Sequence, residues 1–135
     1  MELITWSERY AVHIAEIDQQ HRKLISLLNQ LDDAMTEGKG TSVLGAVLAE
    51  LVEYTLYHFS TEERLFERHS YPGAADHKKE HGDFTARVRK LKQDFDGGNW
   101  MLTIDVLKVL TTWLNNHILG TDKKYEPFLK GKGVS

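Results

Sequence analysis

Apolar residues recur at steps of three and four along four stretches of the chain, which is the spacing of one face of an α-helix. The first helix is expected from Gln19 to Thr36, after Asp18, a residue type that caps helix N-termini. Glycines at 38 and 40 suit a helix end and turn. The inward face of this helix is formed by His21, Leu24, Ile25, Leu28, Leu31 and Met35.

Three further stretches repeat the pattern. Thr41 or Ser42 is expected to cap the second helix, Tyr71-Pro72-Gly73 predicts a turn, and residues 74–76 open the third helix. A Gly-rich break at residues 96–99 precedes the fourth. The inward faces are Leu44, Val47, Leu48, Leu51, Thr55, His58, Glu62, Leu65 and Phe66 in the second, His77, His81, Phe84, Val88, Leu91 and Phe95 in the third, and Leu102, Val106, Leu110, Trp113, Leu114, His117 and Ile118 in the fourth.

Short loops make neighbouring helices antiparallel. The sequence therefore predicts an all-α fold, an up-down-up-down antiparallel four-helix bundle over residues 18–122. An extended N-terminal arm (1–17) and a short C-terminal helical tail (123–135) complete one domain spanning residues 1–135. Pro127 limits the tail helix, and we expect residues 130–135 to be frayed.

Composition narrows the class of protein. The 135 residues are 41% hydrophobic and 27% charged, which is normal for a globular domain. A net charge of −3 without a strongly basic stretch argues against binding to nucleic acid. The absence of cysteine excludes disulfides, thiolate zinc sites and iron–sulfur clusters. With neither a signal peptide nor an apolar segment of membrane-spanning length, we expect a cytoplasmic monomer that does not insert into membranes.

Histidine is unusually frequent, with seven residues, and five of them lie on the inward faces. In an up-down bundle, the starts of the first and third helices and the ends of the second and fourth meet at one end of the molecule. Seven side chains with metal-ligating atoms are therefore expected to converge there: His21, His58, Glu62, His77, His81, His117 and Asp122.

One buried histidine is usually a core residue with a hydrogen-bond partner, but two carboxylates and five imidazoles left unpaired together would be costly. A metal centre satisfies all of them. Seven ligands are too many for one tetrahedral zinc, whereas two octahedral ions can share the carboxylates. Imidazole with carboxylate favours iron over calcium or magnesium, and helix bundles hold di-iron centres.

The order and spacing of these residues resemble the ligand pattern of hemerythrins, in particular single-domain bacteriohemerythrins. The matching ligand motifs are His21, His58-x-x-x-Glu62, His77-x-x-x-His81 and His117-x-x-x-x-Asp122. The matching flanking residues are Ile17-Asp18-Gln19-Gln20 before His21, Trp113 before His117, and Lys123-Lys124-Tyr125 after Asp122. The resemblance extends from about Trp6 to Phe128. His13 stands where many relatives carry glycine, and we interpret it as non-ligating.

The resemblance implies two unequal irons. One would be held by His77, His81 and His117 and be six-coordinate, and the other would be held by His21 and His58 and keep an open position for dioxygen. Glu62 and Asp122 would bridge both irons, together with an oxo or hydroxo group. Leu114, Ile118 and Trp113 would line a dry oxygen pocket, although each also suits ordinary core packing.

Tyr125 is a candidate partner behind the ligands, for shielding or hydrogen bonding, or a purely structural residue. Glu63 is interpreted as a surface acid. The five-residue step from His117 to Asp122 does not fit one face of a regular helix, so we expect a loosened turn near Gly120.

The expected function is reversible dioxygen binding, for oxygen storage, transport or delivery to an oxygen-using partner, and not an enzyme. The alternatives are a di-iron redox enzyme acting on peroxide, nitric oxide or ferrous iron, and a sensor of oxygen or redox state. A histidine-rich ligand set with one open position suits carriage better than it suits high-valent redox chemistry.

Overall fold

The computed structural model describes residues 4–38, 41–98 and 104–135, and all its regular elements are helical. Predicted features at residues 39–40, 99 and 102 lie outside these ranges. In chain order, the elements are a 3₁₀ turn η1 (Glu8–Tyr10), α1 (Ala15–Thr36), α2 (Thr41–His69), α3 (Ala74–Asp96), α4 (Ile104–Asn116), a π-helical turn η2 (His117–Asp122) and α5 (Lys123–Gly131).

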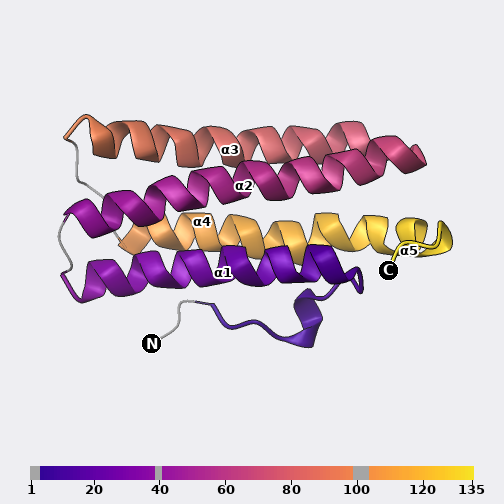
Figure 1. The fold of residues 1–135 in the computed structure, drawn as a ribbon, viewed down its shortest axis with the longest axis horizontal. Helices are drawn as coiled ribbons and strands as arrows, with labels where there is room; N and C mark the ends of the chain where they lie inside the picture. The colour runs from indigo at the N-terminus through magenta and orange to yellow at the C-terminus, as the bar shows by residue number, and fades with distance from the viewer. Residues whose placement is uncertain (1–3, 39–40, 99–103) are drawn as a thin grey trace.

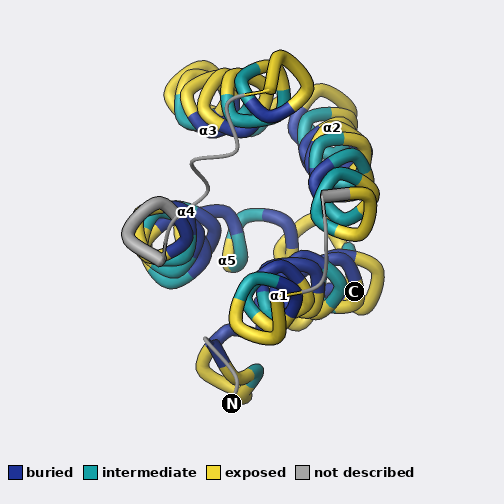
Figure 2. Tube along the Cα trace, turned by 90° about the vertical axis from the view of Figure 1, so that its left-hand side faces the viewer, coloured by how far each residue is buried: buried dark blue, intermediate teal, exposed yellow. Residues whose placement is uncertain are grey.

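The predicted four-helix bundle is confirmed. Helices α1 to α4 lie side by side and alternate in direction, with the arm running along α1 (Figure 1). α2 packs against both α1 and α3, and α1 also contacts α4. Seen from the end, the buried residues of each helix face a common interior (Figure 2). Most of the described apolar residues on the predicted inward faces therefore belong to one core cluster.

A second, smaller cluster closes one end of the bundle. It joins the arm to the end of α2 and to α5 through Val12, Ile14, Ile17, Phe66, Tyr125 and Leu129. The arm and the tail thus cover the end of the bundle at which the candidate ligands were expected.

Asp18 is not the N-cap of the first helix. α1 begins three residues earlier, at Ala15, after Ile14, which makes no side-chain cap. The Asp18 carboxylate lies within the helix and accepts a hydrogen bond from the backbone N–H of Val12 at 2.8 Å. An aspartate near a helix start can bind the preceding chain instead of capping the helix, and here it fixes the arm.

The C-terminal tail is more regular than expected. α5 includes Pro127 and continues to Gly131, and the backbone N–H of Val134 returns to the Leu129 carbonyl at 3.0 Å. Leu129 is fully buried just before residues 130–135, for which we expected fraying and which are mostly exposed. Pro127 stands inside α5 and removes one backbone donor, yet the helix continues beyond it to Gly131.

Candidate metal centre

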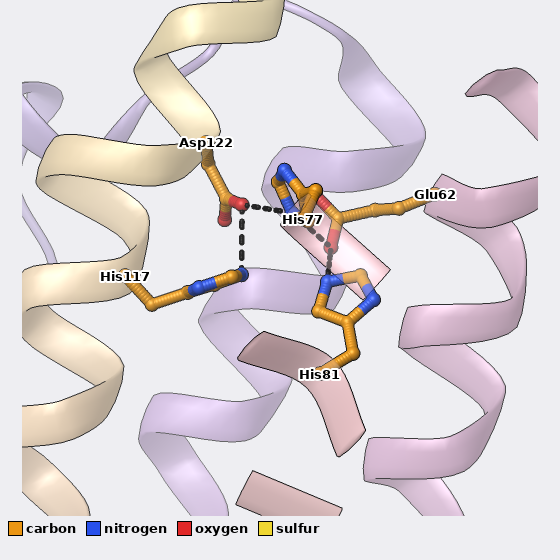
Figure 3. A group of neighbouring side chains, drawn as sticks. All are labelled: Glu62, His77, His81, His117 and Asp122. Atoms are coloured by element: carbon orange, nitrogen blue, oxygen red, sulfur yellow. Dashed lines mark ion pairs between the residues drawn. The ribbon is translucent and has the colours of Figure 1, made fainter. Parts of the chain in front are cut away.

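Four elements deliver seven buried side chains to one place. α1 contributes His21, α2 contributes His58 and Glu62, α3 contributes His77 and His81, and η2 contributes His117 and Asp122. Each of these side chains belongs to a residue that is at most 2% exposed. Figure 3 shows five of them converging from three elements. The structure thus brings together every side chain that the sequence singled out as a ligand.

The ligating atoms form two overlapping groups. In the first, atoms of Glu62, His77, His81, His117 and Asp122 all lie within 4.8 Å of one another. In the second, atoms of His21, His58, Glu62 and Asp122 meet the same limit. The two carboxylates belong to both groups, so the arrangement divides into a three-histidine half and a two-histidine half joined by shared carboxylates.

The carboxylate of Asp122 faces both halves. Its Oδ1 lies 2.9 Å from Nε2 of His77 and 3.0 Å from Nε2 of His117, whereas its Oδ2 lies 3.0 Å from Nε2 of His21. Such a placement suits a carboxylate that bridges two cations.

The Oε1 atom of Glu62 is shared in the same way. It lies 3.2 Å from Nε2 of both His58 and His81, which belong to opposite halves, and 3.9 Å from Nε2 of His77.

The π-helical turn explains the spacing of His117 and Asp122. A π-turn closes hydrogen bonds from i to i+5, so residues five apart share a face. This brings both side chains into the centre, and it is the irregular turn that the sequence predicted near Gly120. π-turns occur frequently at functional sites.

The residues present fit a metal centre. Within the described part of the chain, Nε2 of His21, His77, His81 and His117, Oε1 of Glu62 and both carboxylate oxygens of Asp122 are buried without hydrogen-bond partners. Unpaired buried polar atoms are costly, and here they point at one another. Imidazole nitrogen with carboxylate oxygen is a donor set suited to iron.

The carboxylates and imidazoles of the site shift one another's pKa values. Burial alone would lower the pKa of His117, but Asp122 and Glu62 raise it to about 9. Burial alone would raise the pKa of Asp122, but His117, His21 and His77 hold it well below its ordinary value. Burial lowers the pKa of His58 despite the neighbouring Glu62.

Three histidines are oriented through their outer ring nitrogen. Nδ1 of His58 lies 2.7 Å from the amide oxygen of Gln20. Nδ1 of His81 lies 2.8 Å from a carboxylate oxygen of Glu63. These contacts turn Nε2 of each ring toward the centre.

The third of these histidines, His117, has Nδ1 3.0 Å from a carboxylate oxygen of Glu80, which also accepts a hydrogen bond from the Thr121 hydroxyl at 2.7 Å. Sequence reasoning missed Glu80 and Gln20, and it assigned Glu63 only a surface role. Glu63 is one-third exposed, but it also contacts His81. No spacing rule signals these partners, since each contact crosses between two elements.

Tyr125 donates a hydrogen bond to Oε2 of Glu62 at 2.6 Å. Burial raises the pKa of Tyr125, and Glu62 raises it further, so the phenol remains a donor. The bond leaves the other oxygen of Glu62 facing the histidines. Of the roles that the sequence allowed for Tyr125, which were shielding, hydrogen bonding or a purely structural role, the structure favours hydrogen bonding.

Leu114 and Ile118 are buried, and the half-buried ring of Trp113 stacks on His117 with centroids 4.6 Å apart. His13 is outside both groups of ligating atoms and pairs with Glu126 at 2.8 Å. Its φ of 60° lies in the left-handed region that favours glycine.

Comparison with known proteins identifies the family. The Hemerythrin HHE cation binding domain family matches residues 12–129. The chain belongs to the hemerythrin family. It is 38% identical to a bacteriohemerythrin of Stenotrophomonas maltophilia over 130 residues, which is 96% of this chain and 84% of that protein. It is 31% identical to a bacteriohemerythrin of Methylococcus capsulatus, over 96% of this chain and 98% of that protein.

Solved hemerythrin structures share the fold. A wild-type hemerythrin crystal structure matches with a TM-score of 0.87 at 30% identity, covering 93% of this chain and 96% of that one. Among the residues described for this hemerythrin, no helix is both long enough and apolar enough to span a membrane.

Proposed function

We propose that this hemerythrin binds dioxygen reversibly at a non-haem di-iron centre, for oxygen storage, transport or delivery. The observation that carries the proposal is the pair of overlapping ligand groups that share Glu62 and Asp122. Two separate metal sites would not need both carboxylates in common, whereas a bridged pair does.

The ligands divide unequally in this proposal. His77, His81 and His117 would hold one iron, and His21 and His58 would hold the other, which receives one nitrogen fewer and so keeps an open position. Glu62, Asp122 and an oxo or hydroxo group would bridge them. Two ferrous ions would supply the two electrons that reversible dioxygen binding needs.

The surrounding residues would protect this chemistry from water. Leu114 on α4 and Ile118 on η2 are almost fully buried, three residues before and one residue after His117. Trp113 covers one face of the His117 ring. An apolar wall of this kind disfavours entry of water and loss of charged oxygen species, which supports reversible binding over turnover.

The five-to-two ratio of imidazole to carboxylate favours carriage over the alternative, a redox enzyme acting on peroxide, nitric oxide or ferrous iron. The same centre would also serve a sensor of oxygen or redox state.

The test is an optical titration of the iron-loaded protein between anaerobic and aerobic conditions, with iron counted per chain. Two irons and a visible charge-transfer band that appears with oxygen and disappears on its removal are expected for a carrier. One irreversible oxidation would instead favour the enzyme or the sensor. Fewer than two irons after careful loading would contradict the di-iron centre itself.

A further inference from the structure

The two halves of the centre differ in the groups behind their histidines. In the three-histidine half, His81 contacts the carboxylate of Glu63 and His117 contacts the carboxylate of Glu80. In the two-histidine half, the corresponding contact of His58 is with Gln20, whose side chain is a neutral amide.

The remaining histidines of the two halves, His77 and His21, are alike in their Nδ1 surroundings. Nδ1 of His77 and Nδ1 of His21 are both buried without a hydrogen-bond partner among the residues described. Among the direct partners of the histidine Nδ1 atoms, the halves therefore differ by two carboxylates against one amide. The nearest carboxylate on the amide side, that of Glu16, lies one contact further out, 3.5 Å from Nε2 of Gln20.

These partners are held in place by further contacts. Nε2 of Gln20 lies 3.3 Å from the Thr61 hydroxyl, and Gln20 is only 3% exposed. The same oxygen of Glu80 that faces His117 also accepts a hydrogen bond from the Thr121 hydroxyl. The contact partners of the histidines are thus parts of the packed structure.

A carboxylate behind a histidine does more than orient the ring. It accepts the Nδ1 proton in a charge-assisted hydrogen bond, increases the basicity of the metal-facing nitrogen and adds negative charge behind the ligand. Both effects stabilise a ferric ion more than a ferrous ion, because the ferric ion carries the larger charge. An uncharged amide fixes the ring with a much smaller electronic effect.

We propose that Glu63 and Glu80 are positioning residues that make the iron of the three-histidine half the more easily oxidised of the two. The inference rests on the proposed di-iron centre. When an outer-sphere one-electron oxidant such as ferricyanide reacts with the di-ferrous protein, one electron passes from that iron to the oxidant, which becomes ferrocyanide. No bond is made or broken in this step.

The experiment is an anaerobic redox titration of the iron-loaded protein, which measures the potentials of the first and second one-electron oxidations. Glu63→Gln and Glu80→Gln keep the side-chain shape and remove the charge. Each is expected to raise the first potential more than the second. Loss of a partner behind a metal ligand typically changes affinity by about 10- to 100-fold, and a tenfold change in the ferric-to-ferrous preference corresponds to about 59 mV for one electron.

Matched controls remove the same charge nearby. The control variants are Glu67→Gln and Asp83→Asn. Glu67 lies one turn beyond Glu63 on α2, Asp83 lies one turn beyond Glu80 on α3, and both side chains are exposed. These controls are expected to leave both potentials near their original values. The converse variant, Gln20→Glu, is expected to lower the second potential and bring the two closer together.

The outcomes separate this inference from the function on which it rests. Fewer than two irons in the unaltered protein would overturn the di-iron centre. Two bound irons with first potentials that shift no further in Glu63→Gln and Glu80→Gln than in the controls would overturn the inference alone. A larger shift of the second potential than of the first would also overturn it, since the electron would then leave the other iron first.

Discussion

At the scale of single residues, Tyr125 contacts the centre directly, through its buried hydrogen bond to Glu62. Tyr125→Phe leaves that carboxylate oxygen without its donor, so we expect a loss of about 1–3 kcal/mol in the free energy of unfolding. We also expect faster loss of metal, because Glu62 loses its fixed orientation. Urea denaturation and chelator-driven metal release measure the two effects.

Tyr71→Phe is the matched control, because Tyr71 packs against Tyr125 with ring centroids 6.4 Å apart and lies outside the ligand groups. Equal metal-release rates in Tyr125→Phe and Tyr71→Phe would contradict the orienting role of Tyr125.

The buried residues Leu114 and Ile118 are expected to control autoxidation. Leu114→Ala opens space beside His117 that admits water, and Ile118→Glu adds a carboxylate there, so both should speed the loss of the oxygen-bound spectrum. Leu114→Ala should also cost about 2–5 kcal/mol of stability, as other buried leucine truncations do. The decay of the visible band in air measures the first effect and thermal unfolding measures the second.

Leu107→Ala is the control that distinguishes loss of core packing from entry of water to the centre. Leu107 is fully buried on α4, and ten residues before His117 correspond to about 15 Å along a helix. Its truncation should destabilise the bundle without faster autoxidation. If autoxidation in Leu114→Ala and Ile118→Glu is unchanged, the pocket assignment is wrong.

The ligands could be predicted from sequence because each lies in line with an apolar face, where a buried polar side chain is costly unless it has a partner. His58, in register with Leu51 and Thr55, is an example. Glu63 and Glu80 could not be predicted, because a partly exposed acid beside an inward face resembles any surface acid. Only the orientation of one helix against its neighbour makes these acids partners of histidines.

At the level of elements, the arm is joined to α1 by the hydrogen bond from the Val12 N–H to Asp18. Asp18→Ala should therefore free the arm locally and cost about 1 kcal/mol of stability. Faster hydrogen exchange at the Val12 amide measures the local effect. Asp18→Asn retains an acceptor oxygen and should exchange more slowly than Asp18→Ala. Equal exchange at Val12 in all three proteins would show that other contacts hold the arm.

Helix existence was easier to predict than helix boundaries. The apolar period identified all four bundle helices, since it recurs over many turns in each. A boundary depends on one or two residues, and Asp18 is of a type that can serve either as a cap or, as here, as an acceptor for the preceding chain. The five-residue step from His117 to Asp122 indicated an irregular turn, but its π-helical hydrogen bonding emerges only from the structure.

On the scale of the whole molecule, the bundle concentrates its buried polar groups at one end and its apolar core along the rest. At that end, protonated His117 pairs with ionised Asp122. A bound metal would replace the proton on Nε2 of His117, so metal uptake and proton release are coupled.

This coupling has a definite sign. The pKa of His117 is raised to about 9 in the metal-free protein, so the proton competes with metal throughout the neutral range. The apparent metal affinity should therefore rise from about pH 7 to about pH 9. Above about pH 9, His117 is already deprotonated before metal binds, so it causes no further rise in affinity. His58 should add nothing to this slope, because burial lowers its pKa. Anaerobic ferrous ion titrations against a competing chelator, at several pH values, measure the slope, and a pH indicator measures the released proton. An affinity that stays constant across this range, after correction for the chelator, would show that His117 is already neutral before metal binds.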